Sequence, residues 1–205
     1  MKIHQLPQRS EEWFEVRRGK ITGTVLKRIL GTAKTKETAY WELLADRLSV
    51  NTGSDESDRD RGERLESEAI QAFEAETGKI VDRVGFIQSD ENEFIGCSPD
   101  GLIENKGVYD EGVEVKCLSS REHIRAWLDN KVPDDYYPQV IQQFIVNTDL
   151  KKVYFVLYDP RVRIRPIHII EVEREEVKDD IEKYKQEQIS FIETINNKIN
   201  DLITI

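Results

Sequence analysis

The sequence predicts an α+β domain built on a central mixed β-sheet flanked by helices, and the order of its segments leads to this fold class. Apolar residues at helical spacing occupy much of residues 10–78, and short segments rich in β-branched and aromatic residues follow over residues 80–119. Another helical stretch, two more strand-like segments and a long terminal helix complete the chain. Helices that precede a run of strands are typical of one α+β domain.

Three short helices are expected over residues 10–50. The first begins after Ser10, whose hydroxyl is a suitable cap, carries Trp13 on its apolar side and ends at Gly19. A turn then leads into the second helix, and the third follows it. We interpret this group as the N-terminal part of a single domain that covers residues 1–205.

A polar, acidic stretch over residues 51–60 indicates an exposed loop, and an amphipathic helix follows it. Phe73 belongs to the apolar stripe of this helix, and Gly78 ends it. Glu66 lies beside the same stripe. This helix opens the expected core of the domain, which covers residues 61–172.

After this helix, the apolar residues take the spacing of strands. Turn signals separate the strand-like segments, and neighbouring segments are expected to pair antiparallel, which is the most economical arrangement. The predicted strands cover residues 80–88, 93–103, 112–119, 152–160 and 165–173. Two helices lie between the third and fourth strands, the second with Pro138 in its first turn, and a final helix covers about residues 174–202.

Composition narrows the class of protein. The 205 residues include 40 acidic and 30 basic side chains, a formal net charge of −10, and 38% are hydrophobic, which excludes wholesale disorder, collagen and low-complexity filaments. No apolar stretch approaches the roughly 18 residues of a membrane span, and the N-terminus lacks the apolar core of a signal peptide. We therefore expect a cytoplasmic protein with no membrane partner. Two cysteines are too few for a disulfide framework or a four-cysteine metal site.

The charges are segregated along the chain, which keeps a nucleic-acid partner open despite the acidic total. Residues 9–36 carry eight basic side chains against three acidic ones, and residues 171–188 carry eight acidic against four basic ones. One basic face can attract a polyanion while an acidic remainder keeps the protein soluble. A mixed, solvated surface explains the same charges, so charge alone leaves both interpretations open.

The most informative pattern is a carboxylate after one predicted strand and a Glu-x-Lys on the next. Asp100 ends the first of these strands, and Glu114 and Lys116 lie two residues apart on the second, so strand periodicity sends both to one face. If the strands pair, two carboxylates and an ammonium meet there. Such carboxylates repel each other unless a cation joins them, and oxygen ligands suit Mg²⁺ or Mn²⁺. The lysine can orient or deprotonate a water, or balance the charge of a scissile phosphate.

A structural interpretation of the same residues stays open. In it, Asp100 makes the turn before Gly101, and Glu114 and Lys116 lie on a solvated face of the sheet. The surrounding sequence favours the functional interpretation, because a Ser-Pro pair precedes the aspartate and apolar residues flank Val115 and its two charged neighbours.

Six short blocks lie in order along roughly residues 10–165, and together they resemble one nuclease family. The blocks are Trp13–Thr24, Gly62–Glu66, Cys97–Gly101, Glu114–Cys117, Pro138–Val140 and Tyr158–Arg161. The Pro-Asp and Glu-Val-Lys elements resemble the PD-(D/E)XK nuclease signature, and their surroundings are similar to the phage lambda-type alkaline exonucleases, also called YqaJ-like viral recombinases. Each block alone is weak, whereas six in family order are specific.

The resemblance implies a restriction-endonuclease-like domain that binds Mg²⁺, with two ions per site and Mn²⁺ as a substitute. Asp100, Glu114 and the carbonyl of Val115 would hold the metal, and Lys116 would hold or activate the attacking water. Glu66 would reach the metal site from its helix. The alternative for this glutamate is a charge on a solvated helix flank.

The resemblance also implies three contacts outside the metal ligands. Gln139 would complete the catalytic site, and Arg17 and Thr24 would form the pocket for the terminal 5′-phosphate of DNA. A planar guanidinium and a hydroxyl at a helix start suit a phosphate chemically. The alternatives are an ordinary polar side chain for Gln139 and a surface ion pair for Arg17.

Taken as a whole, the resemblance implies a metal-dependent 5′→3′ exonuclease that degrades double-stranded DNA from 5′-phosphorylated ends in phage or prophage recombination. It also implies a ring-shaped homotrimer and a single-strand annealing protein as a partner. An acidic C-terminal region and the row Arg161, Arg163 and Arg165 would suit the interface of such a ring, with a monomer as the alternative.

Two other functions remain open from the sequence. A PD-(D/E)XK endonuclease would use the same catalytic residues, cut circular DNA and need no pocket for a phosphate end. A non-catalytic DNA-binding recombination module would retain DNA binding with no turnover to lose when Lys116 is replaced.

Overall fold

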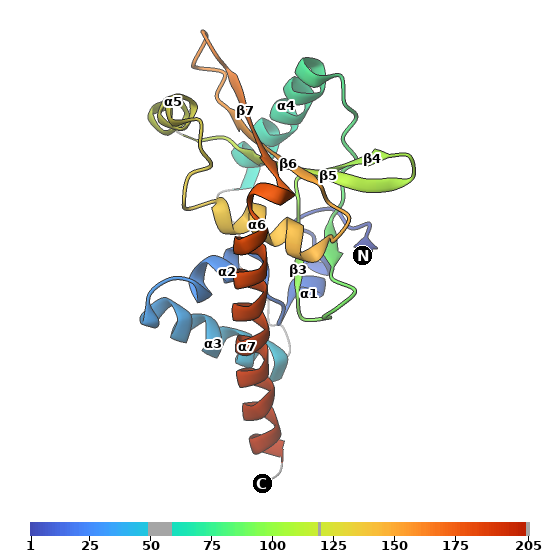
Figure 1. Cartoon of the computed structure of the whole chain (residues 1–205), viewed down its shortest axis with the longest axis vertical. Helices are drawn as coiled ribbons and strands as arrows, with labels where there is room; N and C mark the ends of the chain where they lie inside the picture. The colour runs from blue at the N-terminus through green and yellow to red at the C-terminus, as the bar shows by residue number, and fades with distance from the viewer. Residues whose placement is uncertain (49–58, 119, 204–205) are drawn as a thin grey trace.

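The computed structural model describes residues 1–48, 59–118 and 120–203, and it contains two β-sheets with helices packed around them (Figure 1). The helices are α1 (Glu11–Arg17), α2 (Gly23–Ile29), α3 (Ala33–Leu48), α4 (Arg59–Thr77), α5 (Ser120–Asp129), α6 (Tyr137–Val146) and α7 (Lys178–Ile203), with the 3₁₀ turn η1 (Arg174–Glu176) before the last. The strands are β1 (Lys2–His4), β2 (Phe86–Gln88), β3 (Gly96–Cys97), β4 (Gly101–Asn105), β5 (Val108–Lys116), β6 (Lys152–Tyr158) and β7 (Ile167–Glu173).

The three predicted N-terminal helices are confirmed as α1, α2 and α3. The hydroxyl of Ser10 accepts a hydrogen bond from the backbone N–H of Trp13 at 3.2 Å, as expected of a helix cap. Helix α1 ends at Arg17, and Gly19 follows with φ +66, a left-handed conformation that favours glycine.

The predicted amphipathic helix is confirmed as α4. Phe73 is fully buried on its inner face, and Gly78 follows its last turn with φ +70. The loop expected over residues 51–60 lies largely outside the described residues. Residues 59–60, which were assigned to that loop, form the first positions of α4 instead.

The mixed sheet is confirmed and has the order β4-β5-β6-β7, with β5 and β6 parallel and the other pairs antiparallel. A second, antiparallel sheet, β1-β2-β3, differs from the prediction of a single sheet. The predicted strand over residues 93–103 is interrupted at Ser98–Asp100, so its two halves enter different sheets. The predicted strand over residues 80–88 is reduced to β2, and the chain before it makes an isolated antiparallel bridge between Asp82 and Leu102 of β4.

Strand β6 is buried on both faces, and this defines two cores. Phe155 and Leu157 belong to the larger core under α6, whereas Tyr154 and Val156 face α4. The same alternation holds in the neighbouring strand β5. Its Val113 and Val115 lie opposite Tyr154 and Val156 of β6, and they belong to the same core as these residues. Glu114 and Lys116 alternate with these two valines along β5, so they lie on the opposite face of the sheet, toward α6.

Helix α6 forms the centre of the molecule, and almost every residue in it is buried. It packs against α2 and α7, while the long α7 passes α6 and continues beside α3 to the C-terminus, far from the mixed sheet (Figure 1). Phe191 of α7 stacks edge-on against Tyr40 of α3, with ring centroids 6.3 Å apart. These contacts fix α6 and α2 against the strand end that carries the candidate site.

Candidate active site

Asp100 makes two hydrogen bonds with the backbone of β5. The Oδ2 atom of Asp100 accepts a hydrogen bond from the N–H of Val115 at 2.7 Å, and the N–H of Asp100 donates to the carbonyl of Val113 at 3.2 Å. The predicted convergence of the two strands is therefore found, and it places the aspartate directly beside the Glu-x-Lys element.

Glu114 and Lys116 lie on the same face, as strand periodicity predicts. The Nζ atom of Lys116 donates to Oε1 of Glu114 at 2.5 Å, and Nε2 of Gln143 donates to Oε2 of the same carboxylate at 2.8 Å. Glu114 is only 5% exposed, so the structure does not support a solvated sheet face for this residue. The ammonium also lies 5.4 Å above the ring of Tyr136.

A glycine allows α2 to approach α6 at this site. A Cβ atom at Gly23 would come within 2.8 Å of the Cα atom of Gln139, so the close approach of the two helices depends on the missing side chain. At Gly112 of β5, a Cβ atom would meet only Oε1 of Gln143, the end of a flexible side chain that can move aside. The close approach of α2 and α6 fixes the position of α6 beside β5. It presents two glutamines of α6, one helical turn apart, to the carboxylate of Glu114 and to the hollow beside it.

The electrostatics of the site show two carboxylates that share one ammonium. Burial raises the pKa of Asp100 above its usual range, and the charge of Glu114 raises it further, while Lys116 opposes both effects. Burial works to lower the pKa of Lys116, but the carboxylates of Glu114 and Asp100 outweigh it and raise that pKa. The lysine is therefore a stable cation at neutral pH.

A small hollow of about 50 Å³ adjoins Glu114, and it contains the predicted phosphate-binding residues. Arg17, Thr24 and Gln139 all line it, together with Ser98. The guanidinium of Arg17 donates to the hydroxyl of Ser98 and lies 4.0 Å from the centre of the Trp13 ring.

Burial lowers the pKa of Arg17 to about 10, and the nearby Glu114 opposes this shift, so the guanidinium is charged at neutral pH. A fixed cation, a hydroxyl and an amide that line one hollow form an environment for an anion. The surface ion pair considered for Arg17 is not what the structure shows, because the guanidinium is part-buried and its hydrogen bond goes to the hydroxyl of Ser98.

Glu66 lies close enough to the site to act through its charge, which raises the pKa of Asp100. Its carboxylate, however, accepts a hydrogen bond from Arg83 at 2.9 Å and lies 3.9 Å from Arg9. The structure therefore places Glu66 near Asp100, and two arginines contact its carboxylate. The side chain is 15% exposed, which differs from the solvated flank that the helix pattern also permitted.

Sequence reasoning overlooked two residues of the site. Ser98 lies within the Cys97–Gly101 block that resembles the nuclease family, and its hydroxyl accepts a hydrogen bond from Arg17. Gln143 follows Gln139 by one helical turn, and this spacing was the available signal that both amides lie on the same face of α6.

The residues at this site fit a hard divalent cation with oxygen ligands. Asp100 and Glu114 are close enough for each charge to oppose the other, and a cation between them would relieve that repulsion. Within the described ranges, no group of three or more His, Cys, Asp or Glu side chains is placed to hold a metal. Mg²⁺ typically takes one or two carboxylates and completes its shell with waters and substrate phosphates, so two carboxylates and the carbonyl of Val115 suffice.

The fold and the site together define a class. A mixed sheet that presents Asp100 before one strand, and Glu114 and Lys116 on the next, has the arrangement of the PD-(D/E)XK nuclease superfamily. The sequence model of the YqaJ-like viral recombinase domain matches residues 12–151, and the chain belongs to this family.

Solved structures of alkaline exonucleases share the fold over nearly the whole chain. The alkaline exonuclease LHK-Exo from Laribacter hongkongensis is 28% identical, with a TM-score of 0.81 over 95% of this chain and 97% of that one. The structure of LHK-Exo in complex with dAMP, also 28% identical, gives a TM-score of 0.83 over 94% of this chain and 96% of the other. A phage-related exonuclease from Haemophilus somnus 129PT, 17% identical, shares the fold with a TM-score of 0.56 over 88% of this chain and 96% of that one.

No curated protein sequence matches the chain. In the described part of the chain, none of the helices combines the length and the apolar character that crossing a membrane requires.

Proposed function

We propose that the protein is a Mg²⁺-dependent exonuclease that hydrolyses double-stranded DNA in the 5′→3′ direction from 5′-phosphorylated ends, in phage or prophage recombination within the bacterial cytoplasm. One observation carries this proposal: the paired carboxylates and ammonium of Asp100, Glu114 and Lys116 adjoin a hollow that is lined by Arg17. Membership of the YqaJ-like family and the likeness to alkaline exonucleases support it.

The roles of the catalytic residues follow from their environment. Asp100, Glu114 and the carbonyl of Val115 would hold the metal, which supplies Lewis acidity that activates water and stabilises the leaving oxygen. Because its pKa is raised, Lys116 donates hydrogen bonds from Nζ to the attacking water and the scissile phosphate, and does not remove a proton. Gln143 keeps the carboxylate of Glu114 oriented through its Nε2 atom.

The preference for a 5′-phosphate is proposed from the small hollow. Arg17 is fixed there by Trp13 and Ser98, and Thr24 and Gln139 complete the lining. A terminal phosphate held in this hollow would place the adjacent phosphodiester near Glu114, so cleavage would proceed from the 5′ end.

A ring-shaped homotrimer is the proposed assembly, with a single-strand annealing protein as a partner. Arg163 and Arg165 are exposed on the turn between β6 and β7, whereas Glu175 and Glu176 are exposed beside the start of α7. A head-to-tail ring would bring these opposite charges together and surround the DNA with basic N-terminal segments. Light scattering of the wild type and of Arg163→Glu tests this assembly, and a wild-type monomer that degrades DNA processively would contradict it.

One digestion experiment tests the proposed activity against the two alternatives. Linear 5′-phosphorylated, linear 5′-hydroxyl and covalently closed circular duplexes are each incubated with Mg²⁺ or EDTA. We expect rapid loss of the first, slower loss of the second, and no loss of the third or in EDTA. Cleavage of the circle would indicate an endonuclease.

The Lys116→Ala variant completes the experiment. It should lose turnover while calorimetry still detects Mn²⁺ binding through the two carboxylates. Binding of DNA by wild type and variant, without degradation by either, would indicate a DNA-binding recombination module.

A further inference from the structure

Helix α6 carries three glutamines on one of its faces. Gln142 and Gln143 follow Gln139 by three and four positions, so the three side chains lie on the same side of the helix. Gln139 lines the small hollow, and Gln143 donates to Glu114. Gln142 is fully buried, and a buried amide costs free energy unless it is hydrogen-bonded. Its partners therefore indicate what it does.

The side-chain amide of Gln142 reaches two backbone segments that are far apart in the sequence. Its Nε2 atom donates to the carbonyl of Ile21 at 3.0 Å and to that of Gly96 at 3.2 Å. The same atom lies 3.0 Å from Oε1 of Gln188, a fully buried residue of α7. The two hydrogens of the amide are thus shared among three acceptors, which fixes its orientation.

The two segments also pair with each other, through a single parallel bridge between Ile21 and Ile95. The N–H of Ile21 donates to the carbonyl of Phe94 at 2.7 Å, and the N–H of Gly96 donates to the carbonyl of Ile21 at 3.1 Å. Because the bridge is isolated and lies outside the named strands, a longer ladder does not reinforce it at these residues. The amide of Gln142 binds one carbonyl from each segment and is an additional cross-link between them.

Both segments lead directly into the small hollow beside Glu114. Ile21 precedes residues 22–24 at the start of α2, and Gly96 precedes Cys97 and Ser98, and all five of these following residues line the hollow. The guanidinium of Arg17 is held there by the hydroxyl of Ser98. A shift of either segment would therefore move Thr24 or Ser98 relative to the other, and charge-assisted hydrogen bonds depend on such geometry.

We propose that Gln142 is a positioning residue for recognition of the terminal 5′-phosphate. It holds the segments at Ile21 and Gly96 together, so that Thr24 and the Arg17–Ser98 pair face the same phosphate. Since it is fully buried, it acts through these segments and not by touching the substrate. This role rests on the proposed function, because the hollow is proposed to receive the 5′-phosphate.

A binding measurement without turnover tests this role. Gln142→Met keeps the length of the side chain and removes its amide. Labelled duplexes with 5′-phosphate or 5′-hydroxyl ends are titrated with wild type and variant in Ca²⁺, by fluorescence anisotropy. The ratio of the two affinities should fall by about tenfold in the variant, as expected when one charge-assisted contact is lost. A loss of stability alone would weaken binding of both duplexes equally and leave the ratio unchanged.

Two further variants accompany Gln142→Met. Asn147 is also a buried amide of this helix, but it follows the last turn of α6 and donates to the carbonyl of Tyr109 at 2.8 Å, at the opposite end of β5 from Glu114. Asn147→Leu should therefore keep the wild-type ratio. Gln188→Met removes only the acceptor that orients Gln142, so it should lower the ratio in the same direction by less. This milder variant carries the test if Gln142→Met does not fold.

Amide hydrogen exchange, followed by NMR without DNA, tests the cross-link itself. The amides of Ile21 and Gly96 both donate within the bridge, so their exchange should be faster in Gln142→Met by about tenfold, the usual effect of one lost hydrogen bond on local opening. The amides of β6 should exchange at the wild-type rate. In Asn147→Leu, Ile21 and Gly96 should also exchange as in the wild type.

Unchanged exchange at Ile21 and Gly96 in the Gln142 and Gln188 variants would overturn the proposal. So would an unchanged affinity ratio in these variants when the wild type prefers the 5′-phosphate, because Gln142 would then only stabilise the core. If the wild type binds both duplexes equally, the proposed recognition of a 5′-phosphate fails. The exchange rates then decide by themselves whether Gln142 positions the two segments, so the two proposals fail separately.

Discussion

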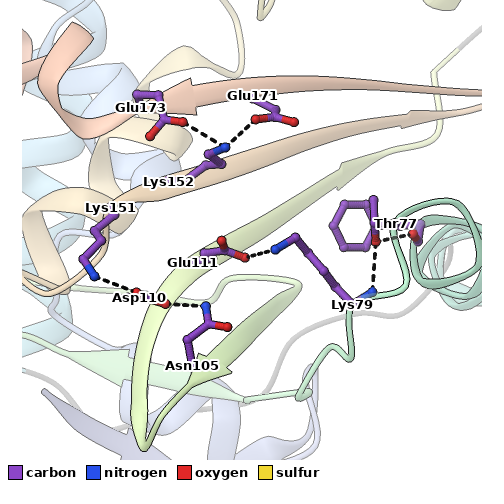
Figure 2. Close-up of polar contacts among 10 residues, drawn as sticks. Thr77, Lys79, Asn105, Asp110, Glu111, Lys151, Lys152, Glu171 and Glu173 are labelled. Atoms are coloured by element: carbon purple, nitrogen blue, oxygen red, sulfur yellow. Dashed lines mark hydrogen bonds and ion pairs between the residues drawn. The ribbon is translucent and has the colours of Figure 1, made fainter.

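Strand β5 has acidic residues near both ends, and the two ends differ in how many lysines pair with these residues. At the start of the strand, Glu111 pairs with Lys79 at 2.7 Å, and Asp110 pairs with Lys151 at 2.9 Å and accepts from Asn105 at 2.6 Å (Figure 2). Each of these carboxylates has a lysine of its own. The hydrogen bond from Asn105 and then that from Lys151 lower the pKa of Asp110.

At the other end of the strand, Asp100 and Glu114 share the single ammonium of Lys116, and the pKa of Asp100 is raised. The residue types are the same, but the balance of charge differs. The contrast teaches that ion pairs with matched charges mark a structural region, whereas an excess of buried carboxylate marks the place where a cation and an anionic substrate would be received.

The largest expected effect tests this difference between the two ends of β5 directly, by neutralising one glutamate at each end. Glu114→Gln should lower the rate of DNA digestion by at least about 10²-fold, the usual cost of removing one group that stabilises the transition state. Glu111→Gln, three residues away, should retain wild-type activity. Rates on linear 5′-phosphorylated duplex measure both, and comparable losses in the two variants would contradict the distinction.

The second largest effect is expected at Arg17, a cation whose hydrogen bond goes to the hydroxyl of Ser98. Arg17→Ala should slow digestion of 5′-phosphorylated ends by about ten- to a hundredfold, which corresponds to one charge-assisted contact of roughly 1.5–3 kcal/mol. Digestion of 5′-hydroxyl ends should fall much less. Equal slowing on the two substrates would assign Arg17 to general contact with the DNA backbone.

The pKa shifts of the two aspartates predict stability changes of opposite sign. The raised pKa of Asp100 means that its favourable contribution is present at low pH and is lost as pH rises through the folded-state pKa. The lowered pKa of Asp110 means that its contribution is present above pH of about 4 and is lost as pH falls. In EDTA at pH 7, Asp100→Asn should therefore stabilise the protein and Asp110→Asn should destabilise it, each by about 1 kcal/mol.

Thermal unfolding from pH 3 to 8 measures both effects. The difference between Asp110→Asn and wild type should shrink as pH falls through the lowered folded-state pKa of Asp110, and the gain in Asp100→Asn should grow with pH. A loss of stability in Asp100→Asn at pH 7 would show that its bond to Val115 outweighs the repulsion from Glu114.

Much of the fold could be predicted, because periodicity reports which faces are buried. The helices and the strands β5, β6 and β7 follow from their apolar patterns. Strand β1 has three residues and exists only through its pairing with β2, with Ile3 opposite Ile87, so no local signal identifies it. The division of residues 93–103 between two sheets follows from the turn at Asp100, which the sequence pattern did not separate from its flanking strands.

The candidate site was predictable where its geometry is local. Glu114 and Lys116 share a face because strands alternate. The resemblance to a known family, and not the pattern, indicated Arg17 and Glu66. The pairing of Glu66 with Arg83 could not be predicted from either, since the two residues are seventeen positions apart in different elements and their contact depends on how the loop folds along α4.

The smallest expected effect lies at the balanced end of the sheet, where the Nζ atom of Lys152 contacts Glu171 at 2.5 Å and Glu173 at 2.8 Å (Figure 2). Lys152→Met keeps the apolar stem beside Tyr154 and removes the charge. We expect a loss of up to about 1 kcal/mol in unfolding free energy, because both glutamates are about half exposed and solvent weakens the pairs.

Urea denaturation of Lys152→Met and wild type in low and high NaCl measures this loss, which should shrink as salt screens the charges. Hydrogen bonds to Glu171 and then Glu173 raise the pKa of Lys152, so its contribution is complete below pH of about 10 and disappears above it. DNA digestion should remain at the wild-type rate. A variant that loses activity as Glu114→Gln does would show that the two ends of the sheet are coupled, and the matched ion pairs could then no longer be treated as purely structural.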